Sequence, residues 1–247
     1  LLGALFAVFG SDFTGSAWIG ALSAILTGAV LGLIFAFITV TLAGDQTVTG
    51  TAINILALGL STYLFRLAYG LEGFSHEVSF FHPLPIPFLS SIPFIGEIFF
   101  RQSLLVYLAF ILVPVTGFFL FRTMWGLSLT AVGDHPRAAD TMGINVIRTR
   151  YLAATVGGML AGLAGSILTL SHLNIFVENI SAGRGFIALA AVVFGQWNPV
   201  GAMFSALLFG VADALQLRLQ TISNVLPYQL LATIPYVLTV LALVGVV

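Results

Sequence analysis

Residues 17–40 form an apolar run that contains no charged side chain. The hydrocarbon core of a bilayer is about 30 Å thick, and a helix of about 20 apolar residues spans it. Comparable runs occupy residues 51–69, 103–121, 151–171, 200–217 and 227–247. Only 7% of the residues are charged, whereas soluble domains carry about 25%. We therefore expect an all-α membrane protein, a polytopic transmembrane helix bundle.

Other apolar segments do not make a complete span. Residues 1–9 look like the tail of a longer span, and the final run ends without a polar tail. Residues 183–195 are too short to cross the bilayer as one straight helix. We expect a single transmembrane domain over residues 1–247, truncated at both ends.

The residue content excludes the main enzyme classes. The chain has no cysteine, which excludes thiolate catalysis, thiolate metal sites and disulfides. It also has no lysine, which a phosphate-binding P-loop requires, and no GxSxG nucleophile elbow. Its histidines are dispersed, so we expect no metal site; they are His76, His82, His135 and His172. A net charge of −1 offers no field to attract nucleic acid. We therefore expect that this chain is not an enzyme.

An arginine-rich connection separates the predicted spans 103–121 and 151–171. Its cations are Arg122, Arg137, Arg148 and Arg150. Short arginine-rich loops remain on the cytoplasmic side of a membrane. This connection is therefore predicted to be cytoplasmic, where a soluble partner can reach it.

Placing the arginine-rich connection in the cytoplasm fixes the side of the membrane on which each remaining loop is expected. Residues 42–50 are then cytoplasmic, and residues 70–102, 172–182 and 218–226 lie outside. Loop 70–102 is predominantly acidic, with Glu72, Glu77 and Glu97 against Arg101. Its prolines block a regular helix. We expect it either to cover the bundle as a lid or to contact an external binding protein.

Residues 133–146, with the sequence GDHPRAADTMGINV, predict a short cytoplasmic helix. Asp134 or the Gly133 backbone can begin it. Pro136 suits the first turn, Gly143 can end the helix, and Arg137 would project from it. The alternative is a solvated amphipathic connector with no partner.

Small residues recur at the spacing used in helix packing. Gly28 and Gly32 form one GxxxG pair, and Gly158 and Gly162 form another. Small faces let membrane helices approach closely. The pairs predict a compact bundle and carry no information about a substrate.

Polar residues inside the predicted spans are candidates for a substrate pathway. Asp213 can face a polar pathway, or it can pair with Arg218 or make a backbone hydrogen bond near the outer interface. Asn54 can contact substrate, or it can hydrogen-bond to a neighbouring helix. These alternatives stay open for each residue.

Two long stretches resemble a known family. Residues 124–168, with MWGLSLTAVGDHPRAADTMGINVIRTRYLAATVGGMLAGLAGSIL, resemble the coupling region of permeases of ABC importers for branched-chain amino acids, simple sugars and nucleosides. Residues 183–210, with GRGFIALAAVVFGQWNPVGAMFSALLFG, are similar to a second stretch of that family, and TAINILALGLS at 51–61 adds to the likeness. Thr130 departs from the usual arginine, and residues 42–50 are poorer in arginine than is usual.

The resemblance implies the permease subunit of an ATP-driven importer in a bacterial inner membrane, surrounded by lipid. A cytoplasmic ABC ATPase would hold Mg-ATP, a second permease, identical or homologous, would complete the pathway, and an external binding protein would deliver substrate. The implied ATPase-coupling residues are Gly133, Asp134, Pro136, Arg137, Ala138, Ala139 and Gly143.

The outer loop and the whole pattern look most like nucleoside and simple-sugar permeases. A small neutral solute agrees with the low charge of the spans. The alternatives are a branched-chain amino acid permease and, further off, a secondary carrier. A carrier would need intramembrane coupling-ion residues, and the sequence shows no chain of them.

Overall fold

The computed structural model describes residues 1–70, 79–85, 100–222 and 233. The predicted final span 227–247 and the acidic residues Glu72, Glu77 and Glu97 lie outside these described residues. Within them, five helices are long and apolar enough to cross a membrane. They are Ala17–Thr41, Gln46–Tyr69, Leu104–Arg122, Val146–Leu173 and Pro199–Gln220. These ranges confirm five of the predicted spans and the helical membrane fold.

The chain divides into two compact units, residues 1–110 with 122–182, and residues 111–121 with 183–247. The first unit contains α1 (Leu2–Thr14), α2 (Ala17–Ala36), α3 (Gln46–Tyr69), α6 (Met124–Asp134), α7 (Pro136–Thr141) and α8 (Val146–Ile167). The second contains α9 (Arg184–Phe194) and α10 (Pro199–Ile222), and α5 (Leu104–Arg122) contributes residues to both. Short π-helical segments, Phe37–Thr41 and Leu168–Leu173, extend α2 and α8.

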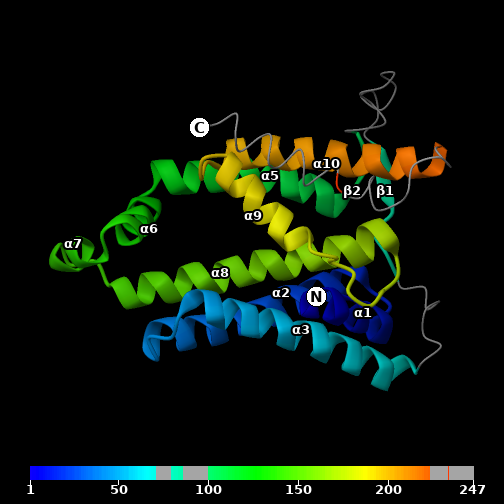
Figure 1. Ribbon diagram of the computed structural model, residues 1–247, viewed down its shortest axis with the longest axis horizontal. Helices are drawn as coiled ribbons and strands as arrows, with labels where there is room; N and C mark the ends of the chain where they lie inside the picture. The colour runs from blue at the N-terminus through cyan, green and yellow to red at the C-terminus, as the bar shows by residue number, and fades with distance from the viewer. Residues whose placement is uncertain (71–78, 86–99, 223–232, 234–247) are drawn as a thin grey trace. The chain divides into compact units, whose positions relative to one another are not determined.

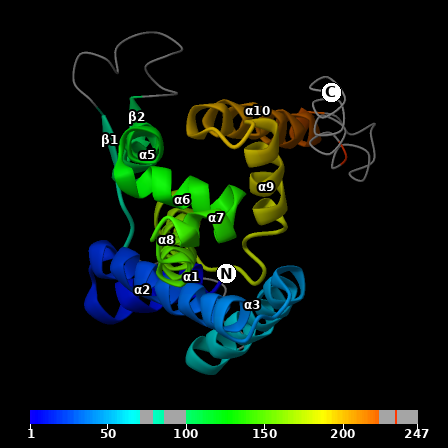
Figure 2. The same cartoon turned by 90° about the vertical axis from the view of Figure 1, so that its left-hand side faces the viewer.

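Helices α1, α2 and α8 form the core of the first unit, and α2 runs alongside α8 (Figure 2). The predicted glycine pairs face one another in this seam. A Cβ on Gly28 would collide with the carbonyl oxygen of Gly158, and one on Gly158 would collide with that of Gly28. A Cβ on Gly162 would likewise strike the carbonyl oxygen of Ala24. Close backbone approach maximises dispersion contacts where lipid supplies no hydrophobic driving force.

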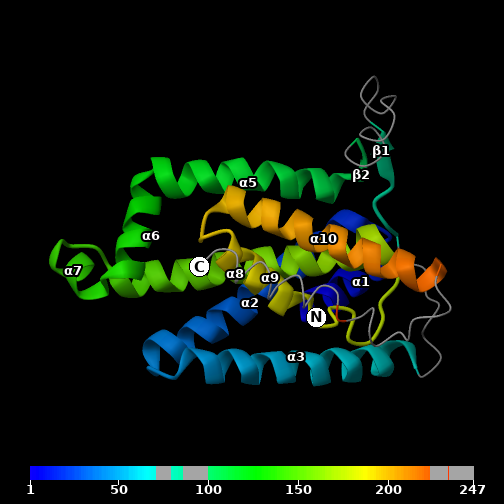
Figure 3. The ribbon, with the colours of Figure 1, turned by 45° about the horizontal axis from the view of Figure 1, so that its top comes forward.

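Both ends of the first unit are defined by polar contacts. At one end, the turn between α2 and α3 lies with α6 and α7 (Figure 3), and the Thr41 and Tyr151 hydroxyls hydrogen-bond there. Asp45 caps α3 by accepting from the N–H groups of Thr47 and Val48 at 2.9 Å each. Both loops predicted to be cytoplasmic, 42–50 and 133–146, are therefore at the same end.

The opposite end of the first unit carries described parts of two segments predicted to lie outside, 70–102 and 172–182. Strand β1 (Pro83–Pro85) pairs antiparallel with β2 (Arg101–Ser103). The N–H of Phe81 donates to the carbonyl of Leu170 at 2.9 Å, which ties the chain before β1 to the end of α8. Arg66, near the end of α3, donates to both carboxylate oxygens of Glu178, at 2.7 and 3.0 Å.

The second unit contains a helical hairpin. Helix α9 packs against α10, and the two meet closely at the turn between them (Figure 1). A Cβ on Gly195 would collide with the backbone of Gly201 and Ala202. Arg184, at the start of α9, lies 3.7 Å from Asp213 of α10. The hairpin is thus fastened near both of its ends.

Candidate functional site

The predicted cytoplasmic helix exists as α7, at the end of the first unit. Helix α6 precedes it, and Thr123 caps α6 by accepting from the N–H of Gly126 at 3.2 Å. Pro136 occupies the first turn of α7 as predicted. Gly143 follows the helix with a φ of 85°, which is the left-handed conformation expected of a terminating glycine. Asn145 then caps α8 by accepting from the N–H of Arg148 at 2.9 Å.

The predicted beginning of α7 was wrong. Gly133 and Asp134 belong to the last turn of α6, and His135 is the residue that precedes α7. The backbone of His135 is non-helical, with a φ of −138° and a ψ of 80°, so the chain breaks between the two helices there. Sequence reasoning missed this because residues 124–134 were not identified as a helix of their own.

Side chains of α7 divide into a packed and an accessible set. Ala139 is only 4% exposed and packs α7 against the rest of the first unit. Arg137 and Ala138 are exposed, and Met142, which follows them, is 83% exposed. A hollow of about 490 Å³ runs beside them, between α7 and the start of α8, with Arg137, Asp140 and Ile147 in its lining. The segment therefore offers a cation, a large apolar side chain and a concave surface together.

Asn54 lies in α3, and its side chain is exposed within the chain. It precedes the buried residues Ala57, Ser61 and Phe65 by 3, 7 and 11 positions. This spacing places all four on one face of the helix. Asn54 therefore points to the same side as the packed part of α3, at a level where no described residue buries it.

Asp213 pairs with Arg184 of α9 and not with Arg218, the sequence-based alternative. Residues 213 and 218 are five positions apart, which puts them on different faces of α10. Both partners of the observed pair are accessible, with side chains 43% and 44% exposed. Asp213 thus joins the two helices of the hairpin.

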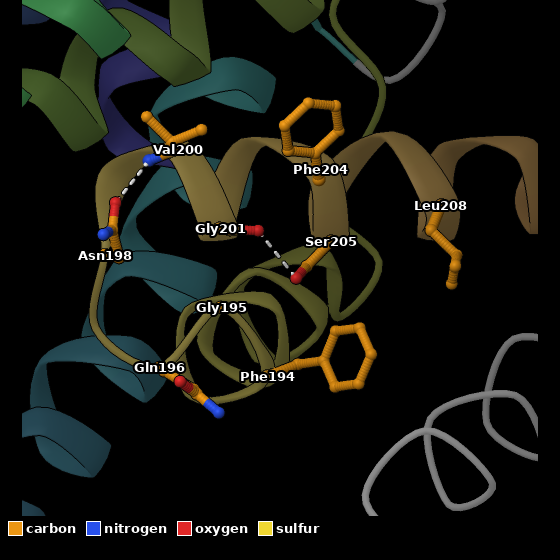
Figure 4. A pocket seen from close by; sticks show the side chains of 9 residues that line it. All are labelled: Phe194, Gly195, Gln196, Asn198, Val200, Gly201, Phe204, Ser205 and Leu208. Carbon is orange, nitrogen blue, oxygen red and sulfur yellow. Dashed lines mark hydrogen bonds between the residues drawn. The ribbon is translucent and has the colours of Figure 1, made fainter. Parts of the chain in front are cut away.

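A second hollow lies at the turn between α9 and α10, and sequence reasoning did not identify it (Figure 4). Its volume is about 540 Å³, which is within the usual range of about 300–1,000 Å³ for small-molecule sites. Aromatic, amide and hydroxyl side chains line it, from Phe194, Gln196, Asn198, Phe204 and Ser205. The available signal was the turn-forming sequence GQWNP inside the apolar stretch 183–210.

Each polar lining group has a different role. Asn198 caps α10 by accepting from the N–H of Val200 at 3.0 Å. Ser205 donates to the carbonyl of Gly201 at 2.8 Å and keeps its oxygen available as an acceptor. Gln196 is exposed, and its amide has no hydrogen-bond partner among the residues that the structure describes. Among the residues that the structure describes, no ionisable side chain lines this hollow.

Comparison with known proteins matches nearly the entire chain to ABC transporter permeases. Residues 1–244 match the family described as the branched-chain amino acid transport system permease component. The guanosine ABC transporter permease protein NupQ of Bacillus subtilis is 41% identical over 96% of this chain and 76% of its own. The putative glucose ABC transporter permease protein TsgC13 of Haloferax volcanii is 40% identical over 90% of this chain and 68% of its own.

A third relative is the nucleoside ABC transporter permease protein NupC of Lactococcus lactis, 38% identical over 92% of this chain and 72% of its own. No solved structure matches the chain. ABC permeases are multi-pass proteins of the plasma membrane, and a separate ATPase hydrolyses the ATP. The chain belongs to the family of branched-chain amino acid transport system permease components and is a transport subunit, not an enzyme.

Proposed function

We propose that this permease conducts a neutral nucleoside across the membrane, driven by Mg-ATP hydrolysis on a cytoplasmic ATPase. The observation that carries the proposal is the similarity along nearly the whole chain to relatives named for guanosine and nucleosides. A simple sugar is the second candidate, because an equally similar relative is named for glucose. A second permease subunit and an external binding protein complete the importer.

Two charges inside the membrane-length helices are paired, which supports a neutral solute. Arg66 and Asp213 lie within membrane-length helices, and each has an ion-pair partner in the structure. A paired charge offers less to a free carboxylate or ammonium group than an unpaired one. An amino-acid zwitterion would need such a group, or a helix terminus aimed at its carboxylate. Nucleosides and sugars need neutral hydrogen-bonding groups instead.

Two residues are proposed for the pathway. Asn54 would face the solute, because it lies on the inner face of α3 beyond the buried residues Ala57 and Ser61. Asp213 would act indirectly, by holding α9 and α10 together through Arg184.

The coupling segment is proposed as the docking site of the ATPase. It comprises Gly133, Asp134, Pro136, Arg137, Ala138, Ala139 and Gly143. Exposed Arg137 and Met142 would supply its charged and apolar contacts. Exposed methionine adapts its shape to a partner surface, and a charged rim steers association.

Uptake by the complete importer tests the substrate. The permease would be reconstituted in proteoliposomes with the ATPase, second permease and binding protein encoded beside it. Radiolabelled guanosine, ribose, glucose and leucine would be compared, with and without ATP. We expect ATP-dependent guanosine uptake. Uptake of leucine alone would overturn the proposal and move the chain to amino-acid transport.

A further inference from the structure

Helices α9 and α10 differ in whether they are long enough to cross the membrane. Helix α9 has 11 residues, which gives a length of about 16 Å, whereas the hydrocarbon core is about 30 Å thick. The chain reverses at Gly195, and α10 runs back past the start of α9, where Asp213 meets Arg184. Helix α9 is therefore too short to cross the bilayer, whereas α10 is long enough to do so. Residues 195–198 join the two helices as a non-helical turn.

Non-helical backbone next to a membrane-spanning helix is tolerated where protein buries it or water borders it. Part of this turn is satisfied internally. The N–H of Trp197 donates to the carbonyl of Val192 at 3.1 Å, and that of Asn198 donates to Gly195 at 3.1 Å. Gln196 differs, because its side-chain amide is exposed and unpaired among the described residues. An unpaired primary amide in hydrocarbon is costly, so we expect it to border an aqueous space.

The surroundings of Gln196 suit a flat, neutral solute. The Phe194 ring projects from α9 on the side where Ser205 and Leu208 project from α10 (Figure 4). Trp197, beside Gln196, is 72% exposed. Aromatic faces stack on nucleobases regardless of base identity. A primary amide presents a donor and an acceptor side by side, which matches the paired groups on the edge of a base.

We propose that the α9–α10 turn contacts the base of a nucleoside in transit. Gln196 would hydrogen-bond the base edge, and Phe194 would stack on its face. A free sugar lacks both the flat face and the paired edge groups, and an amino acid finds no charge in the lining. This inference rests on the proposed nucleoside transport and assigns its recognition to a defined part of the chain.

The first test is uptake of guanosine by complete importers carrying Gln196→Met. Methionine keeps the length and unbranched shape of glutamine but removes the amide. We expect guanosine uptake to fall by about tenfold, as for the loss of one good hydrogen-bonded pair, and Gln196→Asn to restore part of it. The matched control is Gln216→Met on the same hairpin, outside the hollow, which should transport as the wild type does.

The second test uses the absence of cysteine from the native chain. Gln196→Cys would be treated in the complete importer with a membrane-impermeant thiol reagent, and Gln216→Cys would serve as the control. We expect guanosine to slow modification at position 196 and ribose to leave it unchanged, with neither affecting position 216.

The outcomes separate this inference from the proposed function. If the wild-type importer takes up leucine and not guanosine, both fail. If the wild type imports guanosine, the inference alone is overturned by wild-type uptake in Gln196→Met or by absence of guanosine protection at position 196. Selective loss of guanosine uptake together with protection supports it.

Discussion

The α2–α8 seam and the α9–α10 hairpin bring helices together in different ways. In the seam, glycines of each helix lie against backbone carbonyls of the other helix along several turns. Gly32 of α2 and Gly162 of α8 are examples. In the hairpin, close backbone contact is confined to Gly195 and Gly201 at the turn, and an ion pair at 3.7 Å joins the helices further along. Backbone meets backbone at the glycines of the seam, whereas the hairpin borders a hollow lined by neutral polar groups. The first arrangement suits a fixed support, and the second suits a surface that a solute can contact.

The largest effect should come from a side chain placed in the seam. Gly158→Val should destabilise the protein by about 3 kcal/mol, because the new Cβ would collide with the Gly28 carbonyl. The measurement is the melting temperature of the purified permease in detergent. Gly157→Val is the matched control, because a Cβ there meets nothing within 4 Å. Equal melting temperatures for the two variants would mean that the seam is not the rigid element.

Sequence reasoning located the seam's parts but not its pairing. The GxxxG spacing at Gly28 and Gly158 predicted close approach, since small faces are needed for it. Nothing in either pair says which glycine meets which carbonyl, because that depends on the crossing of two helices distant in sequence. The start of α3 was placed late for a related reason. Its first turn, from Gln46, is polar and is begun by the Asp45 cap, so hydrophobicity alone could not show it.

The hairpin was harder to predict than the seam. Residues 183–195 were recognised as too short to cross, but the reversal depends on the strained turn at Gln196 and Trp197, with φ values of 52° and 58°. Non-glycine residues adopt this region infrequently. The pairing of Asp213 with Arg184 then follows from antiparallel packing, which the nearer candidate Arg218 had obscured. The hollow at the α9–α10 turn could therefore be identified from the structure but not from the sequence.

The next effect concerns Arg137, whose exposed side chain is not packed in the interior of the first unit. Arg137→Glu should abolish most transport and substrate-stimulated ATP hydrolysis while changing stability by less than about 0.5 kcal/mol. The side chain is exposed, and reversal of its charge disturbs a complementary interface. Uptake, ATPase activity and melting temperature would be measured together.

The control for Arg137 lies in the same arginine-rich connection. Arg150→Glu also reverses an exposed charge, but at a position in α8 beyond the short helix. It should retain more transport than Arg137→Glu. Wild-type transport by Arg137→Glu in an assembled complex would instead favour a solvated connector with no partner.

A smaller effect should follow from breaking the hairpin's ion pair. Asp213→Asn should destabilise the hairpin by about 1 kcal/mol, since both side chains are accessible and the pair is screened. A double-mutant cycle with Arg184→Gln measures the coupling by melting temperature and guanosine uptake. Arg218→Gln is the control on the same helix. Additive effects of the two single variants would show that the pair does not fasten the hairpin.

The smallest effect concerns the outer ion pair of the first unit and its response to acid. The Arg66 side chain donates to the Glu178 carboxylate, and this lowers the pKa of Glu178 below its ordinary value of 4.5. A lowered pKa in the folded state means that the pair's contribution is present above pH 4.5 and is lost as pH falls through the lower, folded-state pKa. Wild-type protein should therefore lose this small contribution only under strong acid, whereas Glu178→Gln should lack it at every pH. The difference in melting temperature between the two, followed from neutral to acidic pH, should shrink as Glu178 becomes protonated. A difference that grows in acid would show that the Arg66–Glu178 contact does not stabilise the fold, and that this end of the first unit is held by the backbone contact of Phe81 with Leu170 instead.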